Sequence, residues 1–237
     1  NVRDYEEEDK FDIILMNPPY GGTEKKSVQQ NFPTDLRDSE TADLFMVEIL
    51  YRLKQNGKVG IVLPDGFLFG NDNTKVAIKK KLMEECNLHT IIRLPGSIFA
   101  PYTSIATNLL FFDKTGPTQE TWFYRMDLPE GYKAFSKTKP VELKHLQSII
   151  DWWYNRTEIK DLKDDESLTE TYKSKKFTIE ELSNLNYNLD QCGYPKKEEI
   201  ILSPRETIDN FITRRETLEK QLDEKLEGII KIIGDLK

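Results

Sequence analysis

An apolar run that ends in Asn-Pro-Pro-Tyr at residues 17–20 is the feature that most limits how this chain can fold. The run covers residues 11–16, with charged residues before it and two glycines after residue 20, which is the pattern of a short buried strand. In an open α/β sheet, ligands bind at the carboxyl ends of the strands. We therefore expect the Asn-Pro-Pro-Tyr turn to lie at a binding edge of such a sheet.

The residue types of this turn suit one chemical task, which is the handling of an amino group on a flat ring. The side-chain oxygen of Asn17 can accept a hydrogen bond from an –NH2 group. Pro18 and Pro19 fix φ and carry no N–H, so the backbone presents carbonyl acceptors without competing donors. Tyr20 offers a face on which a base can stack. The alternative is a strand that leaves the core through a rigid turn, with Tyr20 packed as a core residue.

Strand and helix patterns alternate after this turn. They predict one helix at residues 41–54, ended by the Asn-Gly pair at 56–57, and a second at residues 73–85. Buried strands are predicted at residues 59–63, 90–94, 105–112 and 121–126. Such alternation gives βαβ units and a parallel sheet. The link between the second and third of these strands is too short for a parallel crossover, so we expect an antiparallel hairpin there.

The pattern changes after residue 132. A helix is expected at residues 141–153, followed by a loop or linker at residues 155–176, where charged side chains dominate. Residues 178–181 (Thr-Ile-Glu-Glu) fit a capping box and start a short helix. We therefore divide the chain into the catalytic-motif half of a domain at residues 1–132, a helical and linker region at 133–202 and a long helix at 203–237.

The last region carries strong helix start signals, with Ser203 as N-cap and Pro204 at the first helical position. The helix is expected to run to near Leu236. Its apolar residues follow a spacing of three and four, broken at Arg215 and Lys225, as in a coiled coil with polar interruptions. These apolar residues are Ile208, Phe211, Leu218, Leu222, Ile229, Ile232 and Leu236. Such a seam is buried against the same domain or against a partner helix.

Two polar segments have open roles. The loop at residues 21–39 follows the turn, so it either closes over a substrate or is an ordinary solvated loop. The helix at residues 73–85 carries a basic cluster that either contacts phosphates or forms a solvated face. This cluster consists of Lys75, Lys79, Lys80 and Lys81.

The composition narrows the class of protein. The chain has 237 residues, of which 38% are hydrophobic and 32% charged, and its formal net charge is −7. A net negative charge is not typical of an autonomous DNA-binding module, although a local patch of the surface can still contact DNA. The two cysteines and two histidines have no metal-ligand spacing, so we expect no metal and a reducing cytoplasm. No apolar run reaches transmembrane length, so we expect no membrane segment.

Together with later blocks, the Asn-Pro-Pro-Tyr turn resembles the modification (M) subunit of type I restriction–modification systems, an adenine-N6 DNA methyltransferase. The later blocks are residues 57–69 (GKVGIVLPDGFLF), 86–95 (CNLHTIIRLP), 97–103 (SIFAPYT), 107–113 (TNLLFFD) and 186–190 (NYNLD). The resemblance spans residues 11–190 and is weakest around 151–176. It implies an α/β fold, the C-terminal half of a Rossmann-like class I methyltransferase sheet, with parallel strands, a terminal antiparallel hairpin and an α-helical C-terminal tail.

The resemblance implies a reaction that moves a methyl group from S-adenosylmethionine to adenine N6 in DNA. Residues 17–20 match the family's catalytic motif, in which hydrogen bonds from the amino group to Asn17 and to the Pro18 carbonyl localise the nitrogen lone pair. Phe99, in the hairpin loop, matches an aromatic residue that helps to clamp the flipped base, and the alternative is a buried hairpin aromatic. The family's Gly-rich cofactor motif precedes its catalytic motif, so we expect it upstream of Asn1.

The chain would then be a fragment that is inactive alone and binds S-adenosylmethionine weakly or not at all. Its implied partners are double-stranded DNA with a flipped adenine, a specificity (S) subunit that binds the C-terminal helix, and a restriction (R) subunit. Two other functions stay open. One is an amino-group methyltransferase that uses the same turn on a protein glutamine or on RNA. The other is a non-catalytic module that docks other subunits.

Overall fold

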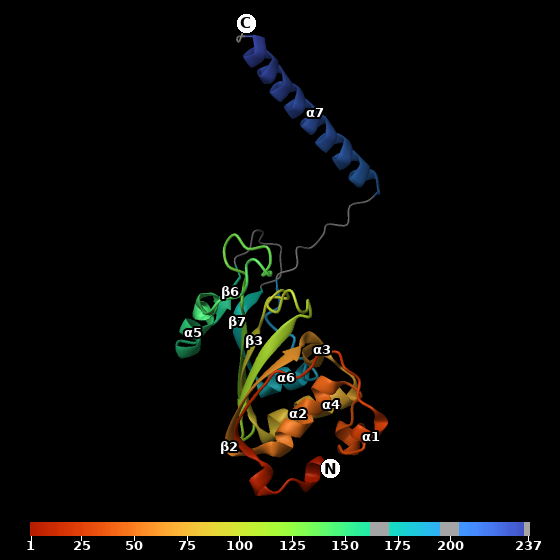
Figure 1. The fold of residues 1–237 in the computed structure, drawn as a ribbon, viewed down its shortest axis with the longest axis vertical. Helices are drawn as coiled ribbons and strands as arrows, with labels where there is room; N and C mark the ends of the chain where they lie inside the picture. The colour runs from red at the N-terminus through yellow and green to blue at the C-terminus, as the bar shows by residue number, and fades with distance from the viewer. Residues whose placement is uncertain (162–170, 195–203, 235–237) are drawn as a thin grey trace. The chain divides into compact units, whose positions relative to one another are not determined.

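The computed structural model describes residues 1–161, 171–194 and 204–234 as a mixed α/β fold (Figure 1). The chain divides into two compact units, Asn1–Pro195 and Lys196–Lys237, and each is described by itself. The strands are β1 (Phe11–Met16), β2 (Leu53–Pro64), β3 (Asn87–Arg93), β4 (Thr107–Asp113), β5 (Glu120–Arg125), β6 (Ile159–Lys160) and β7 (Tyr172–Thr178). The α-helices are α1 (Lys26–Gln29), α2 (Thr41–Arg52), α3 (Asp65–Phe69), α4 (Asn73–Glu85), α5 (Gln147–Tyr154), α6 (Ile179–Asn184) and α7 (Pro204–Gly234). Short 3-10 helices cover Val2–Asp4, Glu7–Asp9, Thr34–Leu36 and Leu143–Leu146.

The described strands form one sheet in the order β1-β2-β4-β3-β5-β7-β6. β1 pairs in parallel with β2, and β3 with β5, while β4 runs antiparallel between β2 and β3. β1, β2, β3 and β5 therefore share one direction, and their carboxyl ends meet at one edge of the sheet. The antiparallel step from β3 to β4 confirms the expected hairpin, and the arrangement confirms the expected α/β class.

Different helices cover the two faces of this sheet (Figure 1). α2, α4 and α6 lie on one face, where Ile61 of β2 packs in a core with Met46 of α2 and Leu82 of α4. α5 lies on the other face, where the ring of Trp152 is 4.6 Å from that of Tyr124 in β5. A fully buried aliphatic or aromatic side chain stabilises the fold by about 1.5–3 kcal/mol. These two cores therefore fix the strands whose ends carry the polar residues described below.

Two of the predicted helix starts are confirmed in detail. The helix predicted at residues 73–85 is α4, which Asp72 caps by accepting a hydrogen bond from the backbone N–H of Lys75 at 3.0 Å. The predicted capping box starts α6. There the Thr178 hydroxyl accepts from the backbone N–H of Glu181 at 3.2 Å, and the Glu181 carboxylate accepts from the N–H of Thr178 at 2.8 Å.

The predicted end of the first helix is wrong. α2 ends at Arg52 and β2 begins at Leu53 without an intervening loop, so the Asn-Gly pair lies inside a strand. Asn56 has φ of 64° and donates its N–H to Lys114, whose own N–H returns to Gly57. This left-handed residue therefore makes an irregularity in β2, at the point where β2 lies between β1 and the end of β4.

The prediction of a loop or linker at residues 155–176 is wrong for its two ends. β6 and most of β7 lie there, and β7 pairs antiparallel with β5. The charged side chains of β7 find partners across the sheet, since Lys173 lies 2.8 Å from Asp127 and Lys176 lies 2.7 Å from Glu120. Cross-strand ion pairs and the backbone ladder thus replace the apolar alternation that usually marks a strand. Residues 162–170 lie outside the described residues.

The helix predicted at residues 141–153 begins later. A 3-10 turn at Leu143–Leu146 leads into α5, because His145 accepts at its ring nitrogen from the N–H of Glu142 and caps that turn. The long C-terminal helix is confirmed as α7, whereas its predicted N-cap Ser203 and its last seam residue Leu236 lie outside the described residues.

Part of the second face is uncovered by the described residues. Ile13 and Leu15 of β1 are 67% and 81% exposed, although both are large and apolar. A Cβ at Gly60 of β2 would lie 3.1 Å from Leu15 and 3.3 Å from the ring of Phe111, so the glycine lets these two side chains approach the strand between them. The result is an open apolar strip beside β1.

Candidate active site

The Asn-Pro-Pro-Tyr turn lies at the carboxyl end of β1, as predicted. Asn17 and Pro19 are exposed, Pro18 is buried, and Tyr20 is half-buried. The Tyr20 hydroxyl donates a hydrogen bond to the side-chain oxygen of Asn17. Burial raises the pKa of the Tyr20 phenol, with the Asn17 hydrogen bond acting the other way, so the hydroxyl remains a donor at neutral pH. The turn therefore holds the Asn17 oxygen in a fixed direction.

Phe99 faces this turn from the loop that links β3 to β4. We call residues 95–106 the aromatic loop. The ring centroids of Tyr20 and Phe99 are 6.3 Å apart and the rings are inclined by 40°. The loop is fixed near Phe99 by Ile98, which is 7% exposed, and by a 2.9 Å hydrogen bond from the N–H of Phe135 to the Ser97 hydroxyl. The structure thus brings together two aromatic residues that are far apart in the sequence, and their role in stacking a base stays a prediction.

An open groove of about 340 Å³ runs beside Asn17. It is lined by Leu15, Met16, Asn17, Gly60, Ile61, Val62, Leu109 and Phe111. Asn17 supplies the polar side chain in this set, and the rest is apolar. A methyl donor such as S-adenosylmethionine also has a charged amino-acid group and ribose hydroxyls, which need charged and hydrogen-bonding partners. The residues that line this groove therefore do not fit that molecule by themselves.

A polar network that sequence reasoning missed lies at the same edge of the sheet. Asp65, just after β2, accepts from the Asn108 amide at 2.6 Å and lies 3.5 Å from the Arg93 guanidinium. Arg93 also pairs with Asp190, so the NYNLD block at residues 186–190 now has a physical role at this edge. The feature that could have indicated this network is the pairing register of the hairpin, because Arg93 at the end of β3 lies directly opposite Asn108 of β4.

A second ion cluster ends the neighbouring strand β5. Arg125 donates to Asp161 at 2.5 Å, to Asp127 at 2.8 Å and to the backbone oxygen of Gly193 at 2.8 Å. Tyr194 donates to the backbone oxygen of Met126 at 2.6 Å. Together with Asp190, these contacts fix the segment before residue 195 along the carboxyl edge of the sheet.

The basic cluster of α4 is divided between the core and the surface of the protein. Lys75 is buried, pairs with Asp43 and lies 3.2 Å from Glu40. Burial alone would lower the pKa of Lys75, but the hydrogen bond and charge of Asp43 raise it above its ordinary value. Lys79 is also buried, and its ammonium group donates to two backbone oxygens of the α3 turn. The remaining two lysines pair with glutamates four residues further along α4. Both interpretations were wrong for Lys75 and Lys79, which face the core, whereas Lys80 and Lys81 are at least partly exposed.

The polar segment after the turn is anchored at several points. Glu24 donates its N–H to Ser39 at 2.8 Å, and Thr41 donates its N–H to Gly22 at 3.0 Å. Phe32 is 6% exposed and so part of the larger core. Closure of this segment over a substrate stays a prediction.

Among the residues that the structure describes, no three or more His, Cys, Asp or Glu side chains cluster in a way that would hold a metal ion. None of the helices in this described part has the length and apolar character needed to cross a bilayer.

Comparison with known proteins points in one direction. The model of a family described as N-6 DNA Methylase matches residues 2–201. Over 208 residues the chain is 43% identical to the type I restriction enzyme EcoEI methylase subunit of Escherichia coli, which covers 88% of the chain and 41% of that protein. A solved structure concerned with complex assembly and conformational transition of the type I R-M system is similar over 96% of this chain and 47% of that one, with a TM-score of 0.70 and 33% identity. The crystal structure of the type I restriction enzyme EcoKI M protein gives a TM-score of 0.59 and 25% identity over 80% of this chain and 44% of that one. The chain thus spans less than half the length of each of these three relatives.

Proposed function

The chain belongs to the N-6 DNA methylase family, and from this premise we propose that it carries the catalytic turn of an adenine-N6 DNA methyltransferase, the M subunit of a type I restriction–modification system. One observation carries the proposal. Asn17, fixed by the Tyr20 hydroxyl, stands at the carboxyl end of β1, and the ring of Phe99 lies 6.3 Å from that of Tyr20. A hydrogen-bond acceptor beside a pair of aromatic rings suits a flat base that carries an amino group.

The turn acts on the amino nitrogen through its acceptors. The N6 lone pair of adenine is delocalised into the ring, which makes the nitrogen a poor nucleophile. Hydrogen bonds from N6–H2 to the Asn17 side-chain oxygen and to the Pro18 carbonyl favour a localised lone pair. An amide oxygen has two lone pairs, so Asn17 can accept from Tyr20 and from the base together. S-adenosylmethionine, when bound, supplies the methyl group, and the turn holds the amino group of the base in position.

The two aromatic rings set the space for the base. A ring stacked between two others needs about 7 Å, because each stacking contact takes about 3.5 Å. The ring centroids of Tyr20 and Phe99 are 6.3 Å apart and the rings are inclined by 40°, so the pair has to open and turn towards parallel when a base enters. The pair would then replace the stacking that adenine loses when it leaves the duplex.

We further propose that a part of the protein outside these 237 residues holds the methyl donor and contains the Gly-rich motif. Two features support this. The groove beside Asn17 lacks charged side chains in its lining. The exposed Ile13 and Leu15 leave an apolar strip at the edge strand, and strands of a parallel sheet are normally covered on both faces. Alone, the chain should bind S-adenosylmethionine weakly or not at all and be inactive.

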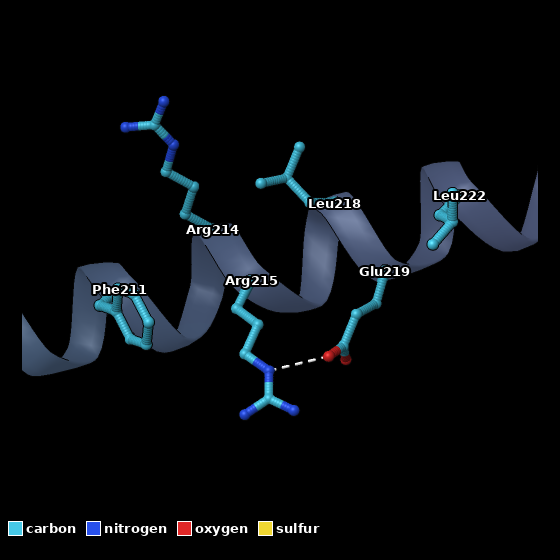
Figure 2. Close-up of a pocket in the computed structure, with 6 residues that line it drawn as sticks. All are labelled: Phe211, Arg214, Arg215, Leu218, Glu219 and Leu222. Carbon is cyan, nitrogen blue, oxygen red and sulfur yellow. Dashed lines mark hydrogen bonds and ion pairs between the residues drawn. The ribbon is translucent and has the colours of Figure 1, made fainter.

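The partners proposed are double-stranded DNA, an S subunit and an R subunit, all in the cytoplasm. α7 supports the S-subunit contact. Ile208, Phe211, Leu218 and Leu222 are each more than half exposed on this helix. Figure 2 shows three of them along one stretch, with Arg215 and Glu219 joined by a 2.8 Å ion pair beside them. An apolar seam flanked by charges is typical of a helix that pairs with another helix.

The experiment that tests the function uses the full-length methylase subunit in complex with its S subunit. Transfer of a labelled methyl group to unmethylated DNA is measured for the wild type and for Asn17→Ala. Loss of a group that stabilises the transition state should slow transfer about 10²–10³-fold. The matched control is Asn87→Ala, because Asn87 begins β3 at the opposite edge of the sheet.

Each outcome decides between the candidate functions. The proposal would be supported if the wild type and Asn87→Ala methylate adenine and Asn17→Ala does not. Unchanged turnover in Asn17→Ala would refute the assigned role of the turn. Wild-type transfer to a glutamine side chain or to RNA would favour the other amino-group methyltransferases. An intact complex that transfers no methyl group would leave the docking module as the better description.

A further inference from the structure

The aromatic loop is held at both of its ends by one carboxylate. The loop leaves β3 after Arg93 and enters β4 at Thr107. The Asp65 carboxylate binds the amide of Asn108 at 2.6 Å on one side and lies 3.5 Å from the Arg93 guanidinium on the other. The backbone N–H of Asp65 also donates to the carbonyl of Ala106 at 3.1 Å. Asp65 therefore bridges the two ends of the loop that presents Phe99.

Arg93 is itself fixed from a distant part of the chain. Its guanidinium pairs with Asp190, and the neighbouring Leu189 is fully buried and donates its N–H to the carbonyl of Leu68 at 3.1 Å. Leu68 belongs to α3, the same short helix that Asp65 begins. The segment around residue 190 thus fixes the Arg93 guanidinium next to the Asp65 carboxylate.

Stability alone does not account for this network. Among the described residues, the Arg93 Nε, the Thr107 hydroxyl and the Asn108 side-chain oxygen are buried without a hydrogen-bond partner. An unpaired buried polar atom costs about 1–3 kcal/mol, and apolar residues of similar volume would avoid that cost. Local departures of this kind from good packing are expected at functional sites.

We propose that Asp65 is a positioning residue that holds the aromatic loop so that Phe99 stacks on the base beside Tyr20. The inference rests on the proposed function, and it adds a residue outside the Asn-Pro-Pro-Tyr turn to the recognition of the flipped base. The ring centroids of Tyr20 and Phe99 are 6.3 Å apart and the rings are inclined by 40°, so Phe99 has to stay close to Tyr20 while its ring turns to admit a base. A loop held at both ends keeps Phe99 near Tyr20, so the ring stays within stacking distance of the base.

The test uses the full-length subunit with its S subunit and three single variants. Asp65→Ala removes both bridges and Phe99→Ala removes the ring. Glu120→Ala is the matched control, because it removes the carboxylate partner of Lys176 at the start of β5, at the opposite edge of the sheet. The readouts are KM for DNA, kcat, and the emission of 2-aminopurine placed at the target adenine, which reports base flipping. Hydrogen exchange of the amides at residues 96–106 reports the loop without any reaction.

Asp65→Ala and Phe99→Ala are each expected to raise KM for DNA about tenfold and to lower the 2-aminopurine emission of the bound complex at least threefold. Glu120→Ala should leave both values within twofold of wild type. Asp65→Ala should also speed exchange in the loop. Asp65→Asn keeps an acceptor for Asn108 and loses the charge opposite Arg93, so its effect should be intermediate. This milder variant serves if Asp65→Ala does not fold.

The double variant separates positioning from a general structural role. If Asp65 acts through Phe99, Asp65→Ala combined with Phe99→Ala should match Phe99→Ala alone within twofold. Three results would each overturn the inference: a double variant in which the two single effects multiply, a Phe99→Ala enzyme with wild-type KM, or unchanged hydrogen exchange in the loop. The proposed function would still stand in these cases if the wild type methylates adenine. A wild type that methylates no adenine would overturn both.

Discussion

Lys79 is a buried cation that makes the stability of this fold depend on pH. Its side chain is 0% exposed, and its Nζ donates to the carbonyls of Leu68 at 3.1 Å and Gly70 at 2.6 Å. Burial lowers the pKa of Lys79 from 10.5 to about 8, although the charges of Asp72 and Asp43 act in the opposite direction. In the unfolded chain the pKa returns to about 10.4.

The sign of the effect follows from proton binding. Between pH 8 and 10.5 the unfolded chain keeps a proton that the folded protein has lost, so the free energy of unfolding rises with pH in this window. The gain is lost as the pH falls through the folded pKa of about 8. A change in pKa from 10.5 to about 8 corresponds to ~3 kcal/mol, of which about 2 kcal/mol falls between pH 7.5 and 9.5.

Urea unfolding of the wild type and of Lys79→Met at pH 7.5, 8.5 and 9.5 measures this contribution. Met fills a similar volume and does not titrate, and the two carbonyls left without a donor add a cost that does not vary with pH. The stability difference between wild type and variant should therefore move by about 2 kcal/mol in favour of the wild type as the pH rises. Lys80→Met, at an exposed position of the same helix, is the matched control for the loss of a lysine from α4. If the difference in the free energy of unfolding between wild type and Lys79→Met changes by less than about 0.5 kcal/mol from pH 7.5 to 9.5, the reasoning is refuted.

Two further predictions concern a cap and a surface. Thr178→Ala removes the hydroxyl that accepts from Glu181 at 3.2 Å, so the free energy of unfolding should fall by about 1 kcal/mol in urea titrations, and an unchanged midpoint would contradict the capping role. Leu218→Asp places a charge in the exposed seam of α7 and should abolish capture of the S subunit in a pull-down. Lys220→Gln, two residues away on another face of the helix, should leave capture intact, and retained capture by Leu218→Asp would exclude the seam as the contact.

The parts of the fold that were predicted correctly are those set by local chemistry. The helix at residues 73–85 and the capping box before α6 depend on residues three or four apart, so the sequence shows them directly. The hairpin followed from the length of a link. The turn at residues 17–20 was recognisable because two prolines and an aromatic residue follow an apolar run.

The parts that were missed depend on partners that are distant in the sequence. β7 has charged residues where a strand usually has apolar ones, and the residues that neutralise them lie on and just after β5. Lys75 and Lys79 look like surface residues until α4 is placed against the carboxylate of Asp43 and the carbonyls of the α3 turn. Burial of charge is a tertiary property, and helical spacing alone does not show it.

The reversed strand has a consequence for how the protein loses activity. β2 and β3 do not pair with each other in the described sheet, and β4 joins them with a ladder on each side. Tyr20 follows β1 on one side of this join, and Phe99 follows β3 on the other. The two rings keep their spacing only while β4 holds both of its neighbours. Inactivation by heat should therefore coincide with cooperative melting of the sheet, because within the described sheet the strands that carry the two rings are joined through β4.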